Sequence, residues 1–318
     1  MVSFRVSALV WLLGAASTAG CASGEGERLS GNLTPSTPPN AAPSPPNAGG
    51  QTPPGTTTPP ASPPGTTTPP AQPPGELSPL GSGVMGGSGT STDRYANRAV
   101  TRDGSNYFFM SNGWGPGFES HTVSWEGTSF TVEQMEGMQG PRWEPASYPT
   151  VFCGVYSETS PECGLPAAID SLTSLRTGWS WRANGNSGEY NAAYDVWLGN
   201  GTARGDFSGY FMVWLRDPPG QQPAGAPSEH RGITVANVEG EWDIWVGEVN
   251  NSPIVNYVRA EGSDSESIEF ELLDFLADAE ARGVEVPGTH ILSVAVGFEI
   301  WNGPITNLES VDFYVAIE

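Results

Sequence analysis

From about residue 91 to the C-terminus, short β-rich runs follow one another with turn residues between them. Each run has about the length of one strand, and Gly, Asn, Asp and Pro separate the runs. Because helices do not alternate with these runs, the pattern predicts an all-β sandwich or barrel and not an α/β fold. The runs are NYFFMSN, HTVSWEG, FTVEQMEG, TVFCGVYS, GWSWRANG, NAAYDVWLGNG, GYFMVWLRDPPG, GITVANVEG, EWDIWVGEV, PIVNYVRAEG, HILSVAVGFEIWNG and SVDFYVAIE.

The run GYFMVWL, residues 209–215, is apolar on both of its faces. Side chains alternate across a strand, so one face of this run is predicted to enter the core and the other to face away. The core set is Phe211, Val213 and Leu215, and the opposite set is Tyr210, Met212 and Trp214. A solvated face does not need three large side chains, which indicates that this second face has a function.

One segment departs from the strand pattern. SDSESIEFELLDFLADAEARG has apolar residues near helical spacing, which predicts one amphipathic helix packed on a sheet. Ser263 and Glu266 match a capping box, and Gly283 suits the C-terminal end. The predicted apolar stripe is Ile268, Leu272, Leu273, Phe275, Leu276 and Ala279.

Residues 22–90 have a different composition, rich in Pro, Thr, Gly and Ser, and the unit PPGTTTPPAS recurs as PPGTTTPPAQ. Such a segment buries too little apolar surface to offset its conformational entropy. We therefore predict a disordered linker over 22–90 and a folded domain over 91–318.

The first 21 residues have the features of an export signal. One Arg precedes an apolar stretch too short to span a bilayer permanently, and the stretch ends in TAGC, which resembles a bacterial lipobox. By that resemblance Cys21 is acylated, and the protein is a membrane-anchored lipoprotein at the cell surface or in the periplasm. The alternative is a plain secretory signal cut near Ala19 or Ala22, which also exports the protein.

Two cysteines lie in the predicted domain, Cys153 and Cys163, in the stretch CGVYSETSPECG. An even pair at this spacing in an exported domain predicts a loop-closing disulfide. Zinc binding is not expected with two cysteines and histidines scattered at 121, 230 and 290. We expect no metal and no cofactor.

The formal net charge is −22, nearly all of it within residues 91–318. So acidic a surface repels nucleic acid and anionic lipid and suits a neutral partner. All of the 11 tryptophans except Trp11 lie after residue 90. Flat aromatic faces stack on sugar rings, so this excess favours a glycan-binding cleft. These tryptophans are Trp114, Trp125, Trp143, Trp179, Trp181, Trp197, Trp214, Trp242, Trp245 and Trp301.

Several motifs occur in one order: SNGWG, SYPTVFCGVYS, YNAAYDVWLGN, GYFMVWL and VAVGFEIWNG. In wording and order they resemble the family 12 glycoside hydrolases, which are endo-β-1,4-glucanases and xyloglucanases with a concanavalin-like jelly roll. The resemblance covers essentially all of 105–318. It implies a two-sheet jelly-roll sandwich, a β-1,4-glucan as the partner, and an enzyme that we expect to be a monomer.

Family members hydrolyse with retention, using two glutamates across a cleft. The resemblance implies that Glu299 in GFEIW is the acid/base. The nucleophile position, two residues before Met212 and four before Trp214, holds Tyr210 instead of a glutamate. No glutamate occurs in this strand, and Asp206 lies four residues upstream, about 13 Å away at strand rise.

The remaining family motifs are present. Asp195 in AYDVW matches the residue that orients the nucleophile, and Asn112 and Trp114 in SNGWG match residues that grip a glucosyl unit on the non-reducing side. Met212 and Trp214 belong to the floor of the same cleft.

Three interpretations follow. The protein is a β-glucan-binding pseudoenzyme, or it still hydrolyses glucan, or it is a lectin for another glycan. Hydrolysis requires either attack by Tyr210 with Asp195 as its base, or a water activated by Asp195 with inversion.

Overall fold

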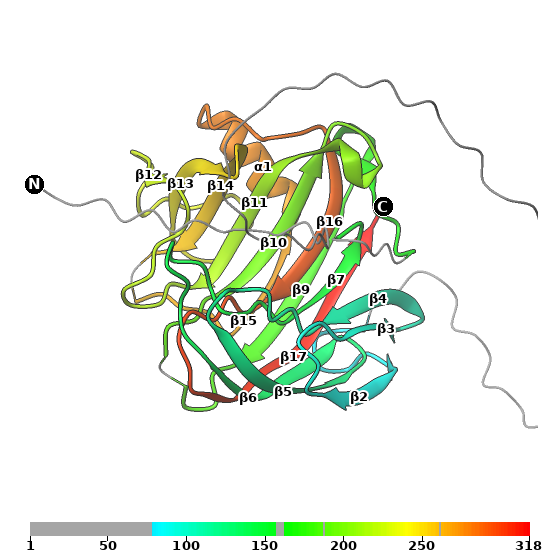
Figure 1. Cartoon of the computed structure of the whole chain (residues 1–318). Helices are drawn as coiled ribbons and strands as arrows, with labels where there is room; N and C mark the ends of the chain where they lie inside the picture. The colour runs from blue at the N-terminus through cyan, green and yellow to red at the C-terminus, as the bar shows by residue number, and fades with distance from the viewer. Residues whose placement is uncertain (1–77, 157–161, 187, 261) are drawn as a thin grey trace, which may run out of the picture. The chain divides into compact units, whose positions relative to one another are not determined.

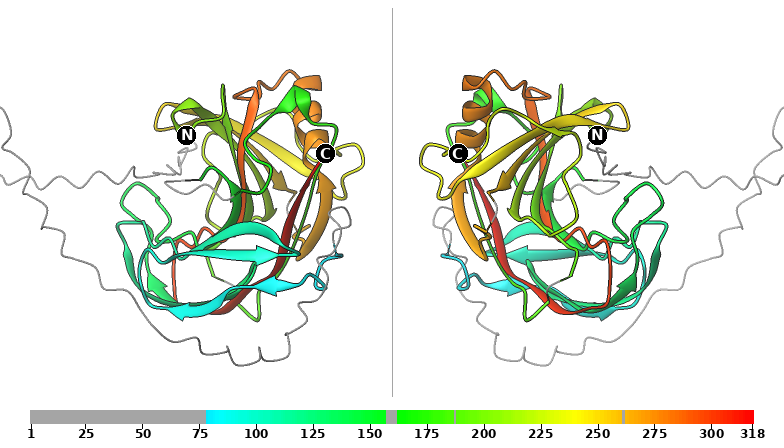
Figure 2. Two further views of the ribbon diagram at one scale, coloured as in Figure 1. Left: turned by 90° about the vertical axis from the view of Figure 1, so that its right-hand side faces the viewer. Right: turned by 90° about the vertical axis from the view of Figure 1, so that its left-hand side faces the viewer.

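The computed structural model describes residues 78–156, 162–186, 188–260 and 262–318, which form two packed β-sheets (Figures 1 and 2). The predicted signal, Cys21 and most of the predicted linker lie outside the described residues. Within the described part of the chain, no helix is long and apolar enough to cross a membrane.

The larger sheet has 11 strands, and β8 (Ala167–Ala168) joins it by pairing with β16. The order across the sheet is β1 (Met85–Gly86), β3 (Asn97–Arg102), β4 (Ser105–Met110), β7 (Thr150–Gly154), β16 (His290–Gly297), β10 (Ala192–Gly199), β11 (Phe207–Arg216), β14 (Ser252–Arg259), β13 (Trp242–Val249) and β12 (Ala226–Pro227).

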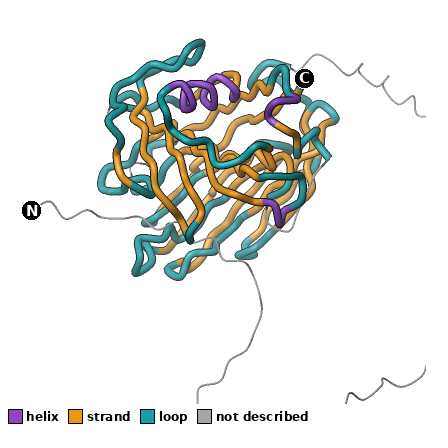
Figure 3. The backbone as a smooth tube through the Cα atoms, turned by 90° about the horizontal axis from the view of Figure 1, so that it is seen from above, coloured by secondary structure: helices purple, strands orange, loops and turns teal. Residues whose placement is uncertain are grey.

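The smaller sheet has 6 strands. Their order is β15 (Ser267–Glu271), β9 (Leu175–Arg182), β17 (Ile305–Ile317), β6 (Ser129–Gly137), β5 (Phe118–Glu126) and β2 (Ser88–Ser91). Two short 3-10 turns, Ile169–Ser171 and Arg204–Asp206, and one α-helix complete the described fold, as Figure 3 shows. The all-β two-sheet sandwich is therefore confirmed, and the barrel alternative is not.

The main core lies between the two sheets and takes alternate residues from each strand. In β11 these are Phe211, Val213 and Leu215, as predicted, and they pack in one cluster with Trp179 and Phe313 of the smaller sheet. The other face of β11 carries Tyr210, Met212 and Trp214, which belong to a separate apolar cluster. The two-faced interpretation of this strand is confirmed.

The helix is shorter than predicted and begins later. It is α1, Leu272–Ala281, and the side chain of Glu271 caps it by accepting from the backbone N–H of Leu273. The predicted Ser263–Glu266 capping box is wrong, because residues 267–271 form strand β15 and pair with β9. Ile268 is therefore buried as a strand residue. The C-terminal prediction is correct, since Gly283 has a left-handed φ of 76°.

The folded domain begins before residue 91. Strand β1 pairs with β3 of the larger sheet, and β2 pairs with β5 of the smaller sheet. Arg102, which is buried, binds Asp312 through two hydrogen bonds of 2.7 and 2.9 Å, and Asp312 also accepts from the backbone N–H of Gly81 at 2.7 Å. The last residues of the predicted linker thus belong to the sandwich.

The predicted disulfide is confirmed. Cys153 lies in β7, Cys163 lies ten residues later in the sequence, and the two are bonded with Cα atoms 5.9 Å apart. The bond joins Cys163 to β7, next to the face of β7 that packs in the main core.

Candidate active site

The face of the larger sheet that points away from the smaller sheet carries its own apolar cluster, which we call the cleft face. Aromatic side chains from several strands and loops form it together with Met212. These aromatic residues are Trp114, Tyr148, Phe152, Tyr156, Trp197, Tyr210, Trp214 and Trp301. These aromatic side chains lie outside the main core and are themselves largely buried.

Glu299 follows the end of β16 and reaches the cleft face. Its neighbours Phe298 and Ile300 are fully buried in the main core, so alternation turns the Glu299 side chain the other way. Its carboxyl group shares a pocket with Met212 and Trp214. This is the placement that the GFEIW motif predicted.

Asn191 holds Glu299 in place. The Asn191 amide nitrogen donates a hydrogen bond to Glu299 Oε2, and the Asn191 side-chain oxygen accepts the backbone N–H of Glu299 at 2.8 Å. Burial raises the pKa of the Glu299 carboxyl to about 8, and the bond from Asn191 offsets part of that rise. Glu299 is therefore protonated at neutral pH, the state that a general acid requires.

Asp195 lies in β10, fully buried, and two side chains hold one of its oxygens. Tyr156 donates its hydroxyl hydrogen to Oδ2 at 3.1 Å, and the Trp197 indole N–H donates to the same oxygen at 3.2 Å. Burial raises the pKa of Asp195 to about 7, while the bonds from Trp197 and Tyr156 lower it. The other oxygen, Oδ1, has no hydrogen-bond partner among the described residues.

Tyr210 stands where the family resemblance puts the nucleophile. It pairs with Trp197 in the β10–β11 register, and its ring packs against Phe207 at 4.8 Å between centroids. Burial and the nearby Asp195 carboxylate raise the pKa of the Tyr210 phenol. Within the described residues, the side chain of Asp195 accepts hydrogen bonds from Tyr156 and Trp197 and makes none with Tyr210.

The SNGWG loop follows β4 and is fixed from behind. The backbone N–H of Tyr148 donates to the carbonyl of Asn112 at 2.9 Å, and the Arg94 guanidinium donates to the carbonyls of Gly113 and Gly115. Asn112 has a left-handed φ of 39°, a conformation that Asn tolerates better than most residues. The loop thus brings Trp114 to the cleft face, as the resemblance implied.

Asn191, Tyr156 and Trp197 were missed as site residues by the sequence reasoning. Asn191 and Asp195 lie in the same motif, YNAAYDVW, but Asn191 contacts Glu299, a residue 108 positions away. A buried carboxyl group needs a hydrogen-bond donor, so the amide side chain of Asn191 in this motif was the signal that the sequence offered.

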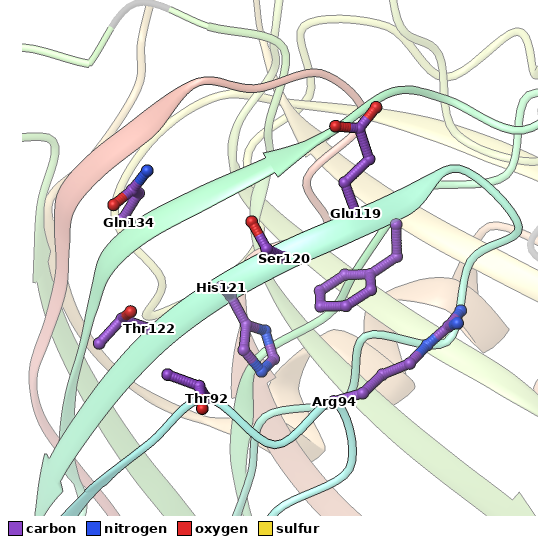
Figure 4. Close-up of a pocket in the computed structure, with 8 residues that line it drawn as sticks. Thr92, Arg94, Glu119, Ser120, His121, Thr122 and Gln134 are labelled. Atoms are coloured by element: carbon purple, nitrogen blue, oxygen red, sulfur yellow. The ribbon is translucent and has the colours of Figure 1, made fainter.

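A second pocket, of about 470 Å³, lies outside the cleft face. It is open and is formed at the beginning of β5, with Arg94, Phe118 and His121 among its lining residues (Figure 4). No cluster of metal-ligating side chains is found here or elsewhere in the described chain.

The fold and the cleft face together define a class: β-sandwich proteins of the glycoside hydrolase type, with a buried carboxyl group set among aromatic side chains. Within that class the chain belongs to glycosyl hydrolase family 12, whose family model matches residues 105–318.

Characterised relatives are distant in sequence. A xyloglucan-specific endo-β-1,4-glucanase A of Aspergillus aculeatus is 27% identical over 157 residues, which are 48% of this chain and 63% of that enzyme. Endoglucanase S of Pectobacterium parmentieri is 25% identical over 217 residues, 62% of this chain and 76% of that enzyme. The chain thus spans less than two thirds of the Aspergillus enzyme.

Solved structures agree with this assignment. A native endo-1,4-β-glucanase CelB2, a cellulase, is 29% identical with a TM-score of 0.60, covering 72% of this chain and 99% of that one. The endoglucanase Cel12A from Rhodothermus marinus is 29% identical with a TM-score of 0.62, covering 72% and 98%.

Proposed function

We propose that this protein binds β-1,4-glucan along its cleft face and that it does not turn the glucan over by the retaining mechanism. The observation that supports the proposal most is the contrast between Glu299 and Tyr210. Glu299 keeps its Asn191 contact and its aromatic pocket, whereas the position for the attacking carboxylate holds a phenol. The relatives named as endoglucanases and xyloglucanases supply the class of polysaccharide.

The chemical argument concerns the first half of the retaining reaction. A retaining glycosidase needs two carboxyl groups about 5–5.5 Å apart, one to attack the anomeric carbon and one to protonate the leaving oxygen. Glu299 is suited to the second task, since its raised pKa keeps its proton at neutral pH. Tyr210 is unsuited to the first, because a phenol with a raised pKa remains protonated and is a weak nucleophile.

A second candidate function is slow hydrolysis with Asp195 as the base. Asp195 Oδ1 has no partner among the described residues, and a pKa of about 7 matches a base that acts near neutrality. In this reaction Asp195 accepts a proton from water, the water oxygen bonds to the anomeric carbon, and Glu299 gives its proton to the leaving oxygen. Attack by Tyr210 is less well supported, because Asp195 makes no hydrogen bond to it in the described chain.

One pair of measurements tests the proposal. The full chain is incubated with carboxymethylcellulose, xyloglucan and mixed-linkage glucan while reducing ends are counted, and cellohexaose binding is measured by calorimetry. Binding without reducing ends supports the proposal. Reducing ends that disappear in both Asp195→Asn and Glu299→Gln support the second candidate, and absence of binding to any of these glucans removes both.

We also propose that the protein is exported and tethered through an acylated Cys21, and that it is a monomer. The support is the TAGC motif after a short apolar stretch and the pairing of Cys153 with Cys163, since disulfides persist in oxidising compartments. Labelling of the wild-type protein by radioactive palmitate, and its loss in Cys21→Ala, tests the anchor. Sedimentation velocity of the purified protein tests the monomer.

A further inference from the structure

Four side chains close a ring of hydrogen bonds beside the pocket of Glu299. The side-chain nitrogen of Gln221 donates to Glu189 Oε2 at 2.8 Å and to Gln139 Oε1 at 3.0 Å. The side-chain nitrogen of Asn302 donates to the same Glu189 oxygen, and its side-chain oxygen accepts the backbone N–H of Gln139 at 3.2 Å. We call these four residues, Gln139, Glu189, Gln221 and Asn302, the clamp.

The clamp joins segments that are far apart in the sequence. Gln139 and Gln221 lie in the loops that follow β6 and β11, whereas Glu189 precedes β10 and Asn302 follows β16. Glu189 Oε2 accepts from both Gln221 and Asn302, and hydrogen bonds to a carboxylate are roughly twice as strong as those between neutral groups. Gln221 is buried, which shields its bonds from water. Glu189 is therefore the centre of the clamp.

Alternation places the side chain of Glu189 on the same side of the chain as that of Glu299. Tyr190 pairs with Ile300, and both are buried in the main core. Their neighbours Glu189 and Glu299 therefore point away from that core. The backbone N–H of Trp301 donates to the carbonyl of Glu189 at 2.8 Å, which holds the two segments together.

The segments that the clamp joins also supply the walls of the Glu299 pocket. The indole N–H of Trp301 donates to the carbonyl of Trp143 at 2.9 Å, and the side-chain nitrogen of Gln222 donates to the carbonyl of Gln221 at 2.7 Å. No clamp residue is among the described residues that line the pocket, so the clamp acts on Glu299 through its neighbours. The lining residues from these segments are Trp143, Pro145, Gln222, Ala224 and Trp301.

We propose that Glu189 is a positioning residue for Glu299, and that its carboxylate holds the two loops and Trp301 around the acid so that water stays out of the pocket. The inference rests on the proposed function for the role of Glu299. Its test needs no glucan, so a protein that binds no glucan would remove the proposed function and leave the clamp standing. Because burial is the main cause of the raised pKa of Glu299, loosening these loops should lower that pKa.

The test is a titration of Glu299 in the full chain, followed by carbon-13 NMR of the glutamate carboxyl groups, with Glu299→Gln to assign the signal. Glu189→Leu removes the acceptor of the clamp. It should lower the pKa of Glu299 from about 8 toward the ordinary value of 4.5, by at least about one pH unit. Glu189→Gln keeps an oxygen that accepts from both Gln221 and Asn302, so it should retain most of the raised value.

The comparison of Leu with Gln separates the clamp from the charge of Glu189. Loss of a nearby negative charge also lowers the pKa of a carboxyl group, but both variants lose that charge equally. A fall in Glu189→Gln as large as that in Glu189→Leu would overturn the proposal, and so would an unchanged pKa in Glu189→Leu. Asp195 and Asn191, which also shift the pKa of Glu299, are the same in every variant.

Glu271→Leu is the matched control for a general loss of stability. Glu271 is also a carboxylate that joins two segments, since it caps α1 and accepts from the Ser174 hydroxyl and the Leu175 backbone N–H, both at 2.6 Å. This variant should lower the melting temperature without changing the pKa of Glu299, and a fall equal to that in Glu189→Leu would overturn the clamp. If Glu189→Leu does not fold, Gln221→Leu replaces it: a lower pKa of Glu299 supports the clamp, and an unchanged one overturns it.

Discussion

The two positions of the cleft face that the family resemblance makes catalytic differ in the side chains they hold. At the end of β16, Glu299 retains a carboxyl group, its Asn191 contact and an apolar pocket. On β11, Tyr210 stands at the position that the family resemblance gives to a carboxylate, although Asp195 nearby has two donors arranged around it. Under the proposed function, the side chains that would hold a glucan and the charge that would attack it are separable, because the first set is present and the second is not.

Restoring the missing carboxylate is the strongest way to test this comparison. Tyr210→Glu is expected to raise hydrolysis of carboxymethylcellulose by at least about a thousandfold over wild type, since an attacking carboxylate supplies the first step of the reaction. Initial rates of reducing-end release measure it. Tyr210→Gln is the control, because a Gln side chain has the shape of Glu without its charge. This variant is expected to remain inactive.

Glu299→Gln in the Tyr210→Glu protein is expected to abolish the new activity, because the leaving oxygen then lacks its proton donor. A contrary result would be an inert Tyr210→Glu protein beside a wild type that hydrolyses glucan and loses this activity in Asp195→Asn. The chemistry would then run through Asp195.

The second prediction concerns the pKa of the position that is intact. Under the proposed function Glu299 acts in its protonated form, so hydrolysis by Tyr210→Glu should fall on a basic limb at or above about pH 8, because the added carboxylate raises the pKa of Glu299 further. Asn191→Leu keeps the site filled but removes the donor that lowers the pKa of Glu299, so the basic limb should move to higher pH. The pH profile of kcat/KM measures the shift, and an unchanged limb would mean that Asn191 only packs.

The smallest expected effect is a difference between Glu299 and Tyr210 in how the stability of their variants depends on pH. The folded-state pKa of Glu299, about 8, lies above the ordinary value of 4.5, so folding favours its protonated form. Its ionisation therefore costs stability progressively as the pH rises from about 4.5 to 8. At pH 8, Glu299→Gln should therefore melt at a higher temperature than wild type, with an unfolding free energy larger by at most a few kcal/mol. At pH 4.5 the variant should gain little stability over wild type.

Tyr210→Phe is the matched variant for the neutral position. It removes no group that ionises below pH 8, so the difference between its melting temperature and that of wild type should be the same at pH 4.5 and pH 8. A pH-dependent difference in Tyr210→Phe, or none in Glu299→Gln, would contradict the distinction between the two positions.

Local sequence patterns predicted the parts of this molecule that depend on alternation. The two faces of β11 and the turning of Glu299 away from Phe298 and Ile300 follow from a strand period of two. The start of α1 did not follow, because Ile268 fits a helical stripe as well as a strand and only pairing with β9 decides between them. Strands β1 and β2 were missed because their Gly- and Ser-rich residues carry little apolar signal.

The hydrogen bonds of the site could not be predicted from the sequence in the same way. The contact between Asn191 and Glu299 joins residues 108 positions apart, and the one between Tyr156 and Asp195 joins residues 39 apart. Such contacts depend on how strands are ordered across the sheet, which local periodicity does not encode.

The attachment of residues 81–91 to both sheets has a mechanical consequence. If the protein is tethered by its N-terminus while its cleft holds an insoluble polysaccharide, tension enters the described domain at Ser78, whose carbonyl accepts a hydrogen bond from Arg102 at 2.8 Å, next to the ion pair of Arg102 and Asp312. Beyond that point the load meets two strands in series, since β1 pairs with one sheet and β2, next along the chain, pairs with the other. Detaching β1 from the larger sheet would therefore leave β2 paired with the smaller sheet.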